Sequence, residues 1–140
     1  MTRFYRYAAK ALGSATLGIV QIAHAQVPAP FRGSVPAGNI IFLSGQIGIA
    51  PAGADPAKEG IDEASRKAMD GVGTELARAG LTFRNVKKCT VMLIDIGALE
   101  RFNQTYRRYF SPKLLPARSA FQVRGLARGA LVEIECVAYR

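Results

Sequence analysis

Two stretches of the sequence carry apolar residues at helical spacing, and short apolar runs with the length of strands surround them. The stretches 61–79 and 97–110 repeat an apolar residue every three or four positions, which is typical of helices that bury one face. Strands are expected at 18–25, 40–44, 86–94, 120–123 and 130–139. This order predicts a two-layer α/β or α+β domain, in which both helices cover one face of a mixed sheet.

The last predicted strand alternates apolar and acidic residues. Because side chains alternate between the faces of a sheet, Glu133 and Glu135 should share one face and Val132, Ile134 and Cys136 the other. Solvent is the simplest environment for the two acids. The face of the sheet away from the helices still needs a cover, and the apolar alternation suggests another subunit.

The chain is strongly basic, with a net charge of +9 over 140 residues and a pI near 10.1. Such a balance favours anionic partners, namely nucleic acid, acidic membrane surfaces or small carboxylates. The basic residues are scattered, apart from Arg107-Arg108 and Lys87-Lys88. Most of the charge is therefore explained by a solvated surface.

The length of 140 residues predicts a single domain.

The N-terminal residues 1–25 allow two interpretations. A basic start, an apolar stretch and the sequence Ala23-His24-Ala25 together match a cleaved export signal. Alternatively, residues 18–25 form a first strand, which cleavage after Ala25 would remove. Residues 26–140 are expected to form the domain proper, and its first part, 26–38, is rich in Pro and Gly and is expected to be irregular.

The cysteines and the single histidine exclude several kinds of site. Cys89 and Cys136 each lie in an apolar run and are expected to be buried, reduced thiols, or a disulfide if the protein is exported. No histidine follows His24, so a Ser-His-Asp or Cys-His pair is excluded beyond that point. No cluster has metal-ligand spacing and no Gly-rich phosphate loop is present. An enzyme of this sequence would work through arginine, carboxylate, hydroxyl, backbone and water.

A few polar residues stand where packing alone would not place them. Ser44 and Gly45 end a buried apolar run, and Asn103 lies beside the apolar stripe of the second helix. Arg118 follows Pro116-Ala117 just before a predicted strand, and Glu133 interrupts the final apolar run. The structural alternative for Arg118 is an ion pair with a glutamate.

These residues belong to a series of motifs. In chain order the motifs are Gly38-Asn39-Ile40-Ile41-Phe42-Leu43-Ser44-Gly45-Gln46-Ile47, Ala79-Gly80-Leu81, Val86-Lys87-Lys88-Cys89-Thr90-Val91, Phe102-Asn103-Gln104-Thr105-Tyr106, Pro116-Ala117-Arg118-Ser119 and Val132-Glu133-Ile134-Glu135. Together they resemble the reactive intermediate deaminase (RidA, or YjgF) family over roughly residues 28–138. Each motif alone would be weak, but the series in this order is specific.

The resemblance implies a chorismate-mutase-like fold, with a mixed six-stranded sheet, two helices on one face and a homotrimer with clefts between subunits. It implies hydrolysis of 2-imino acids to 2-keto acids and ammonia, without a metal or organic cofactor. Arg118 matches the arginine that binds the substrate carboxylate, and Glu133 the carboxylate that positions water. Ser44, Gly45 and Asn103 match positions that line the cleft. The expected partners are small 2-imino and 2-keto acids, and no membrane partner is expected.

One position departs from the family pattern. Phe31 stands where the deaminases usually carry tyrosine, and this removes a hydroxyl from the rim of the cleft. The loss of one hydrogen bond is worth about 1 kcal/mol, or roughly fivefold to tenfold in rate if it acts in the transition state. Phe31 could instead favour more apolar imino acids. Two alternatives stay open: a carboxylate-binding or regulatory trimer without turnover, and, less favoured, an RNA-binding or endoribonuclease-like protein.

Overall fold

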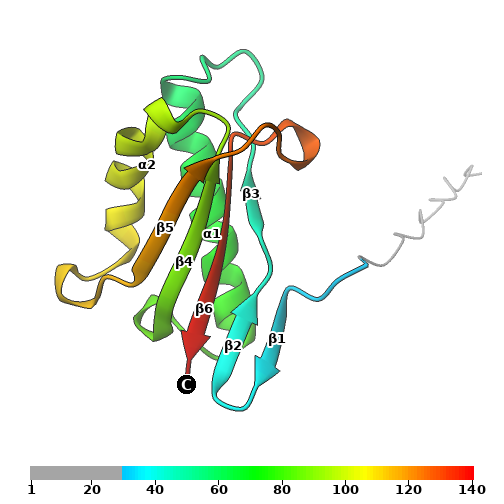
Figure 1. Cartoon of the computed structure of the whole chain (residues 1–140), viewed down its shortest axis with the longest axis vertical. Coiled ribbons are helices and arrows are strands. Elements are labelled where there is room, and N and C mark those ends of the chain that lie inside the picture. The colour runs from blue at the N-terminus through cyan, green and yellow to red at the C-terminus, as the bar shows by residue number, and fades with distance from the viewer. Residues whose placement is uncertain (1–29) are drawn as a thin grey trace, which may run out of the picture.

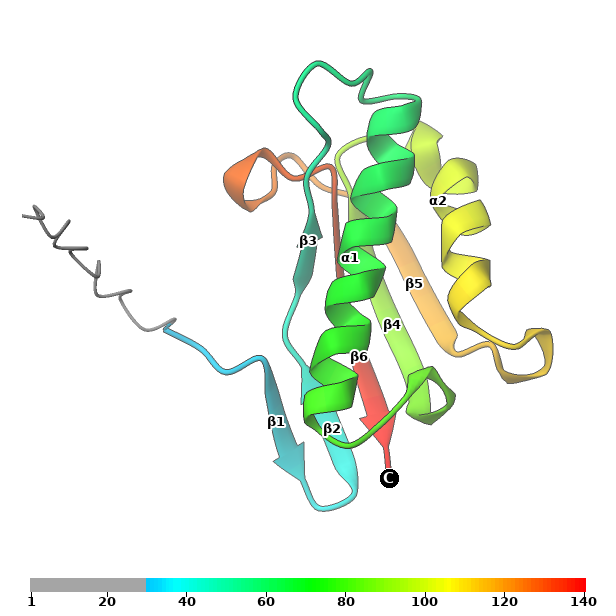
Figure 2. The ribbon, with the colours of Figure 1, turned by 180° about the vertical axis from the view of Figure 1, so that it is seen from behind.

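The computed structural model describes residues 30–140, which form one sheet with two helices on one of its faces (Figures 1 and 2). The strands are β1 (Ser34–Ala37), β2 (Ile40–Leu43), β3 (Gln46–Gly48), β4 (Val86–Leu93), β5 (Ala117–Gln122) and β6 (Val132–Tyr139). The helices are α1 (Glu59–Arg78) and α2 (Leu99–Tyr106), and 3-10 turns extend α2 over Ile96–Ala98 and Arg107–Tyr109. The predicted α+β fold with a mixed six-stranded sheet is confirmed.

The strand order places β6 in the middle of the sheet and β5 at one edge. The order is β1-β2-β6-β4-β5, and β3 continues beyond β2 as a second partner of β6. Strands β4 and β5 are parallel, and the other pairs are antiparallel. Parallel neighbours need a crossover connection, and here α2 provides it. As a result α2 lies beside β5, whereas α1 packs behind β3 and β6 (Figures 1 and 2).

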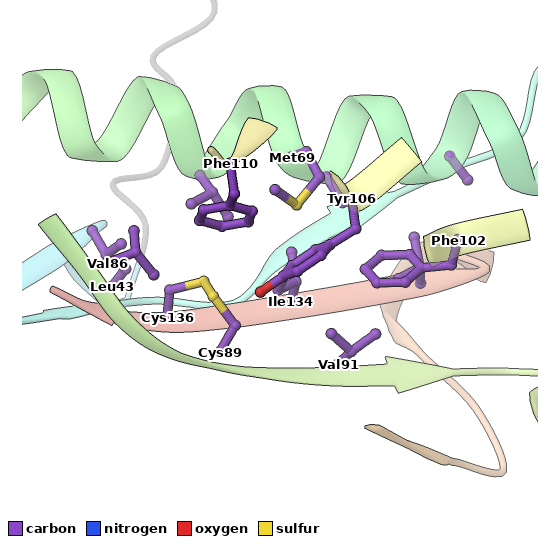
Figure 3. Packing of buried hydrophobic residues seen from close by; sticks show 14 of the residues in the cluster. Leu43, Met69, Val86, Cys89, Val91, Phe102, Tyr106, Phe110, Ile134 and Cys136 are labelled. Carbon is purple, nitrogen blue, oxygen red and sulfur yellow. A yellow bond between two sulfur atoms is a disulfide. The ribbon is translucent and has the colours of Figure 1, made fainter. Parts of the chain in front are cut away.

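The core fills the space between the helices and the sheet (Figure 3). The apolar face of α1 is fully buried there, as its three- and four-residue spacing predicts. In β6, and in β4 from Cys89 onward, every second residue faces this core. The largest fully buried side chains include Phe102, Ile41, Ile61, Met69, Leu76, Leu93 and Ile134.

Two strand boundaries differ from the prediction. Residues 34–37, expected to be irregular, form the edge strand β1, because they pair with β2 across a turn at Gly38, whose φ is +61°. Strand β5 begins at Ala117 rather than at residue 120, since its parallel register with β4 starts there. Arg118 therefore lies inside a strand. The export signal or first strand predicted within 1–25 lies outside the described residues.

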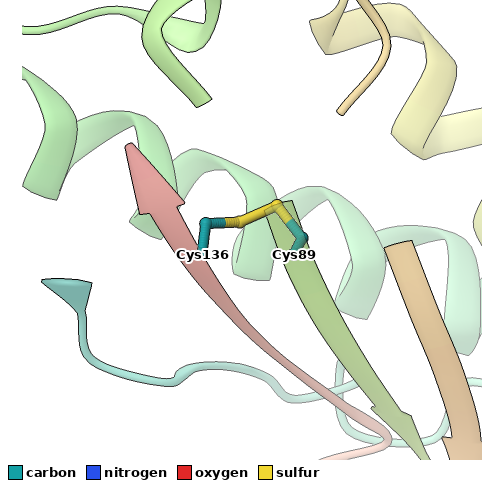
Figure 4. Close-up of a disulfide and its surroundings, with 2 residues drawn as sticks. All are labelled: Cys89 and Cys136. Atoms are coloured by element: carbon teal, nitrogen blue, oxygen red, sulfur yellow. A yellow bond between two sulfur atoms is a disulfide. The ribbon is translucent and has the colours of Figure 1, made fainter. Parts of the chain in front are cut away.

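Cys89 and Cys136 form a disulfide, so the expectation of reduced thiols is wrong for this structure (Figure 4). The two residues are direct partners in the antiparallel register of β4 and β6, with Cα atoms 4.1 Å apart. Each apolar run predicts burial of its cysteine, and both are buried, at 1% and 2% exposure. The pairing depends on the register between strands 47 residues apart, which the runs do not contain.

The face of the sheet away from the helices carries large apolar side chains in the open. Ile40, Phe42, Phe121 and Tyr139 lie there, each between 40% and 50% exposed. A second subunit as the cover of this face stays a prediction. Within residues 30–140, neither helix combines the length and the apolar character that crossing a membrane requires.

Candidate functional site

Arg118 lies on the helix side of β5, against α2. In the parallel register it is level with Cys89, whose side chain belongs to the core. Its Nη1 donates a hydrogen bond of 2.7 Å to Oδ1 of Asn103. Its guanidinium carbon is 5.0 Å from the centre of the Tyr106 ring and 5.9 Å from that of Phe102. A half-buried cation is thus held by one amide and two aromatic rings.

No carboxylate of the described residues lies within the 4.0 Å of Arg118 that defines an ion pair. The alternative role of Arg118, a structural pair with a glutamate, therefore has no support within this part of the chain. A guanidinium has five N–H donors in a planar fork that matches a carboxylate. Among residues 30–140 only Asn103 engages one of these donors, which leaves the others available to an anion.

Asn103 is itself oriented by its own helix. Its Nδ2 donates to Oε2 of Glu100 at 3.2 Å, one turn earlier on α2. This bond directs the amide oxygen, the atom that accepts from Arg118, toward β5. Asn103 thus contacts and orients Arg118 directly. Its expected place in the lining of the cleft does not predict this contact.

Tyr106 follows Asn103 by three residues on the same helix. The residue is only 4% exposed, and its hydroxyl has no hydrogen-bond partner among the described residues. Burial raises the pKa of this phenol to about 12, partly offset by the nearby charge of Arg118. The apolar spacing within 97–110 predicts burial of Tyr106 but not its contact with Arg118. The available signal was its one-turn spacing from Asn103.

Ser44, Gly45 and Glu133 form a second cluster where β2 gives way to β3. Glu133 pairs with Ile47 in the register of β6 and β3, and its carboxylate lies directly on Gly45, where an added Cβ would overlap it. Ser44 donates from Oγ to the carbonyl of Arg32 at 2.6 Å. This bond ties the chain next to Phe31 to the cluster, and Phe31 itself is 64% exposed.

The two clusters do not meet within one chain. Arg118 faces the helices, whereas Glu133 alternates with buried Val132 and Ile134 and faces the opposite side of the sheet. Their strands are also separated by β4, which is two strand spacings or about 10 Å. The structure therefore groups Arg118 with Asn103, and Ser44 and Gly45 with Glu133, but leaves the two groups apart.

Two surface pockets are lined by residues other than Arg118 and Glu133. One of about 490 Å³ is lined by residues of α1 and of the end of α2. Its charged residues largely neutralise one another, as in the ion pair of Arg66 with Glu63. Another of about 270 Å³ lies over β2, β4 and β6 beside Glu135. Within residues 30–140, no group of three or more His, Cys, Asp or Glu side chains is arranged to hold a metal ion.

Comparisons of the sequence with known proteins find close matches in one family. The model of the family described as endoribonuclease L-PSP matches residues 22–140. The 2-iminobutanoate/2-iminopropanoate deaminase of Bos taurus is 38% identical over 120 residues, which cover 84% of this chain and 87% of the relative. The enzyme of the same name from Homo sapiens is 38% identical over 109 residues, covering 78% of this chain and 79% of the relative.

Comparisons with solved structures agree with these sequence matches. The E. coli YjgF gene product matches with a TM-score of 0.69 and 32% identity, covering 81% of this chain and 91% of that one. E. coli TdcF with bound serine matches with a TM-score of 0.68 and 30% identity, over the same shares of the two chains. Family model, relatives and structures agree with the series of motifs in the sequence, and the chain belongs to the RidA/YjgF family.

Proposed function

We propose that the protein hydrolyses 2-imino acids to 2-keto acids and ammonia, with Arg118 binding the substrate carboxylate. The observation that carries this proposal is a half-buried arginine without a carboxylate partner among the described residues, held by Asn103 and two aromatic rings. Relatives that share 38% identity are named for deamination of such imines, and TdcF was solved with serine, itself a small amino acid with a carboxylate.

Hydrolysis of a protonated imine depends more on the orientation of the substrate and the water than on a strong base. A protonated imine carbon is already electrophilic, so a placed water can attack it. In the proposed reaction Glu133 orients that water and accepts a proton from it, and the new C–O bond gives a tetrahedral aminoalcohol. Glu133 then returns its proton to the amine nitrogen, and collapse to the keto acid breaks the C–N bond and releases ammonia. The proton of the former hydroxyl passes to the ammonia, which leaves as ammonium. The positive charge of the iminium is complementary to the carboxylate of Glu133.

The proposed site combines two chains. Since Arg118 and Glu133 face opposite sides of one sheet, a cleft that holds both would take Arg118 from one subunit and Glu133 from its neighbour. The exposed apolar face around Phe42 and Phe121 offers a surface for such contact. A homotrimer with three such clefts is the assembly that we propose. Ser44, Gly45 and Phe31 would then line the cleft beside Glu133.

The first test is imine hydrolysis by purified protein. An amino-acid oxidase generates 2-imino acids of several side-chain classes, and semicarbazide traps what remains. We expect the parent to accelerate hydrolysis, and Arg118→Ala to lose at least about 100-fold in kcat/KM, the scale of a lost charged contact. Arg84→Ala, which removes the same charge from an exposed turn, is the control and should match the parent.

The second test mixes two inactive variants. In a trimer of Arg118→Ala and Glu133→Gln chains, one cleft in each mixed trimer combines an intact Arg118 with an intact Glu133. Random mixing should then restore about a quarter of the parental activity, because three quarters of the trimers are mixed. If both variants assemble and mixing restores nothing, the shared site is refuted. If the parent binds a 2-keto acid but hydrolyses no imine, the protein is a carboxylate-binding module instead.

A further inference from the structure

The guanidinium of Arg118 has two supports on α2, spaced one turn apart. Asn103 accepts a hydrogen bond from Nη1 of the guanidinium, and the ring of Tyr106 lies 5.0 Å from the guanidinium carbon. Figure 3 shows Tyr106 between Phe102 and Phe110, with its hydroxyl directed toward the strands. The ring contacts Phe110 at a centroid distance of 4.7 Å and Phe102 at 5.5 Å. The tyrosine is therefore fixed by its neighbours before any ligand arrives.

The ring of Tyr106, and not its hydroxyl, makes the contact that matters for Arg118. The hydroxyl is buried without a partner among the described residues, and a phenylalanine would fill almost the same volume without that unsatisfied group. Phe102 also lies near the guanidinium, but its ring is farther away, at 5.9 Å, which is the outer limit of a cation–π contact. Tyr106 is the stronger of the two aromatic supports.

We propose that Tyr106 is a positioning residue for Arg118. Its ring and the Asn103 amide restrict the guanidinium to one orientation, in which the donors not used by Asn103 point toward the substrate carboxylate. An arginine side chain is rich in rotamers, and fixing it before binding lowers the entropic cost of binding. This inference rests on the proposed function, since it assigns Tyr106 a task in the same carboxylate site.

The test compares variants that keep or remove the ring. Tyr106→Phe keeps it, whereas Tyr106→Leu and Tyr106→Met fill the space with apolar side chains that have no ring. Phe83→Leu is the matched control, because it truncates an aromatic ring that stacks on Phe110 and Tyr109 and not on Tyr106 or Arg118. Titration calorimetry with 2-oxobutanoate gives Kd, imine hydrolysis gives KM and kcat, and thermal unfolding gives Tm.

Removal of the ring should weaken binding of the carboxylate and leave the chemical step alone. We expect Tyr106→Leu and Tyr106→Met to raise Kd and KM by about threefold to thirtyfold, the range of a partly desolvated cation–π contact. The kcat should stay within about twofold of the parent, since binding of the carboxylate is common to the ground state and the transition state. Tyr106→Phe should restore Kd and KM to parental values. Phe83→Leu should lower Tm with Kd unchanged.

Other outcomes separate the inference from the proposed function. Parental Kd in both ringless variants overturns the positioning role even if hydrolysis is normal. A Kd for Tyr106→Phe as weak as that for Tyr106→Leu also overturns it, because the hydroxyl would then be the active group. If the parent binds 2-oxobutanoate but hydrolyses no imine, the proposed function fails while the Kd series still decides the role of Tyr106. If the parent hydrolyses imines without binding 2-oxobutanoate, the KM series decides the role of Tyr106, and if it does neither, both proposals are refuted.

Discussion

Arg118 and Glu133 project from opposite faces of one sheet, although only β4 separates the strands that carry them. The register shows why: Arg118 is level with Cys89 on the core side, and Glu133 is level with Met92 on the open side. A single chain cannot turn both side chains to one ligand without rebuilding the sheet. Any chemistry that uses both residues therefore has to be shared between two copies of the chain.

Gly45 is predicted to be required for the position of Glu133. In Gly45→Ala the new methyl group would overlap the Glu133 carboxylate, which has to move away from Gly45. Because the backbone of Gly45 has an ordinary φ, we expect the fold to remain and imine hydrolysis to fall by about tenfold or more, as when a catalytic group is misplaced by about 1 Å.

Gly125→Ala is the control for this change, since a Cβ there meets no atom within 4 Å. Both variants should keep the Tm of the parent within a few degrees. An active Gly45→Ala enzyme would show that the carboxylate of Glu133 does not act from the position described here.

Replacing Asn103 by aspartate should weaken carboxylate binding. A carboxylate in place of the amide oxygen, 2.7 Å from Nη1, would neutralise the charge that Arg118 offers to the ligand. We expect Asn103→Asp to raise KM at least about tenfold, measured by imine hydrolysis over a range of substrate concentrations. Gln104→Glu adds the same charge at the next, exposed position of α2 and should leave KM close to the parental value.

The disulfide should contribute strongly to stability. It closes a loop of 47 residues, and the chain-entropy estimate for such a loop is about 4 kcal/mol. Urea unfolding of the double variant Cys89→Ala/Cys136→Ala should show a loss of this order, and a reductant should destabilise the parent but not the variant. Equal unfolding midpoints of the parent with and without reductant would contradict the bond. If residues 1–25 act as an export signal, they would deliver the chain to an oxidising compartment, where such bonds form.

Stability at high pH should depend on Tyr106. Burial raises the pKa of this phenol from 10.0 to about 12, so between these values the unfolded chain loses a proton that the folded chain keeps. The free energy of unfolding should therefore fall as the pH rises from 10 to 12. Tyr106→Phe removes this contribution, so its stability relative to the parent should increase over that range, as urea unfolding at several pH values would show.

At neutral pH the phenols of Tyr106, which is buried, and Tyr109, which is only partly buried, should behave differently. Tyr106→Phe should stabilise the protein by about 1 kcal/mol, because it removes a buried hydroxyl without a partner among the described residues. Tyr109→Phe should destabilise it, because the Tyr109 hydroxyl donates to Asp70 at 2.7 Å. Loss of stability in Tyr106→Phe at neutral pH would mean that the hydroxyl has a partner in the assembled protein.

The periodicity of the sequence predicts which residues each helix or strand buries. It says less about which other residues those side chains contact. The alternation around Glu133 correctly predicts its face, and the stripe on 97–110 correctly predicts that Phe102 and Tyr106 are buried. The contact of Arg118 with Asn103 depends on the parallel register of β5 with β4, and no local pattern encodes that register. The same holds for the pairing of Cys89 with Cys136.

Strand β1 was missed for a different reason. Its proline and the glycines on either side favour turns, and so the stretch 26–38 was expected to be irregular. An edge strand tolerates proline, because one of its sides needs no hydrogen bonds from the sheet. Composition alone does not distinguish such an edge strand from a loop.

The helix that connects β4 to β5 also carries the side chains that hold Arg118. Sheet topology and the position of the Arg118 guanidinium are thus determined by one segment of the chain, α2. A change in the length or tilt of this crossover would shift the donors of Arg118 together with the strand that carries it. Substitutions on β1, at the far edge of the sheet, meet no such constraint, so sequence variation that leaves the surroundings of Arg118 intact should concentrate there.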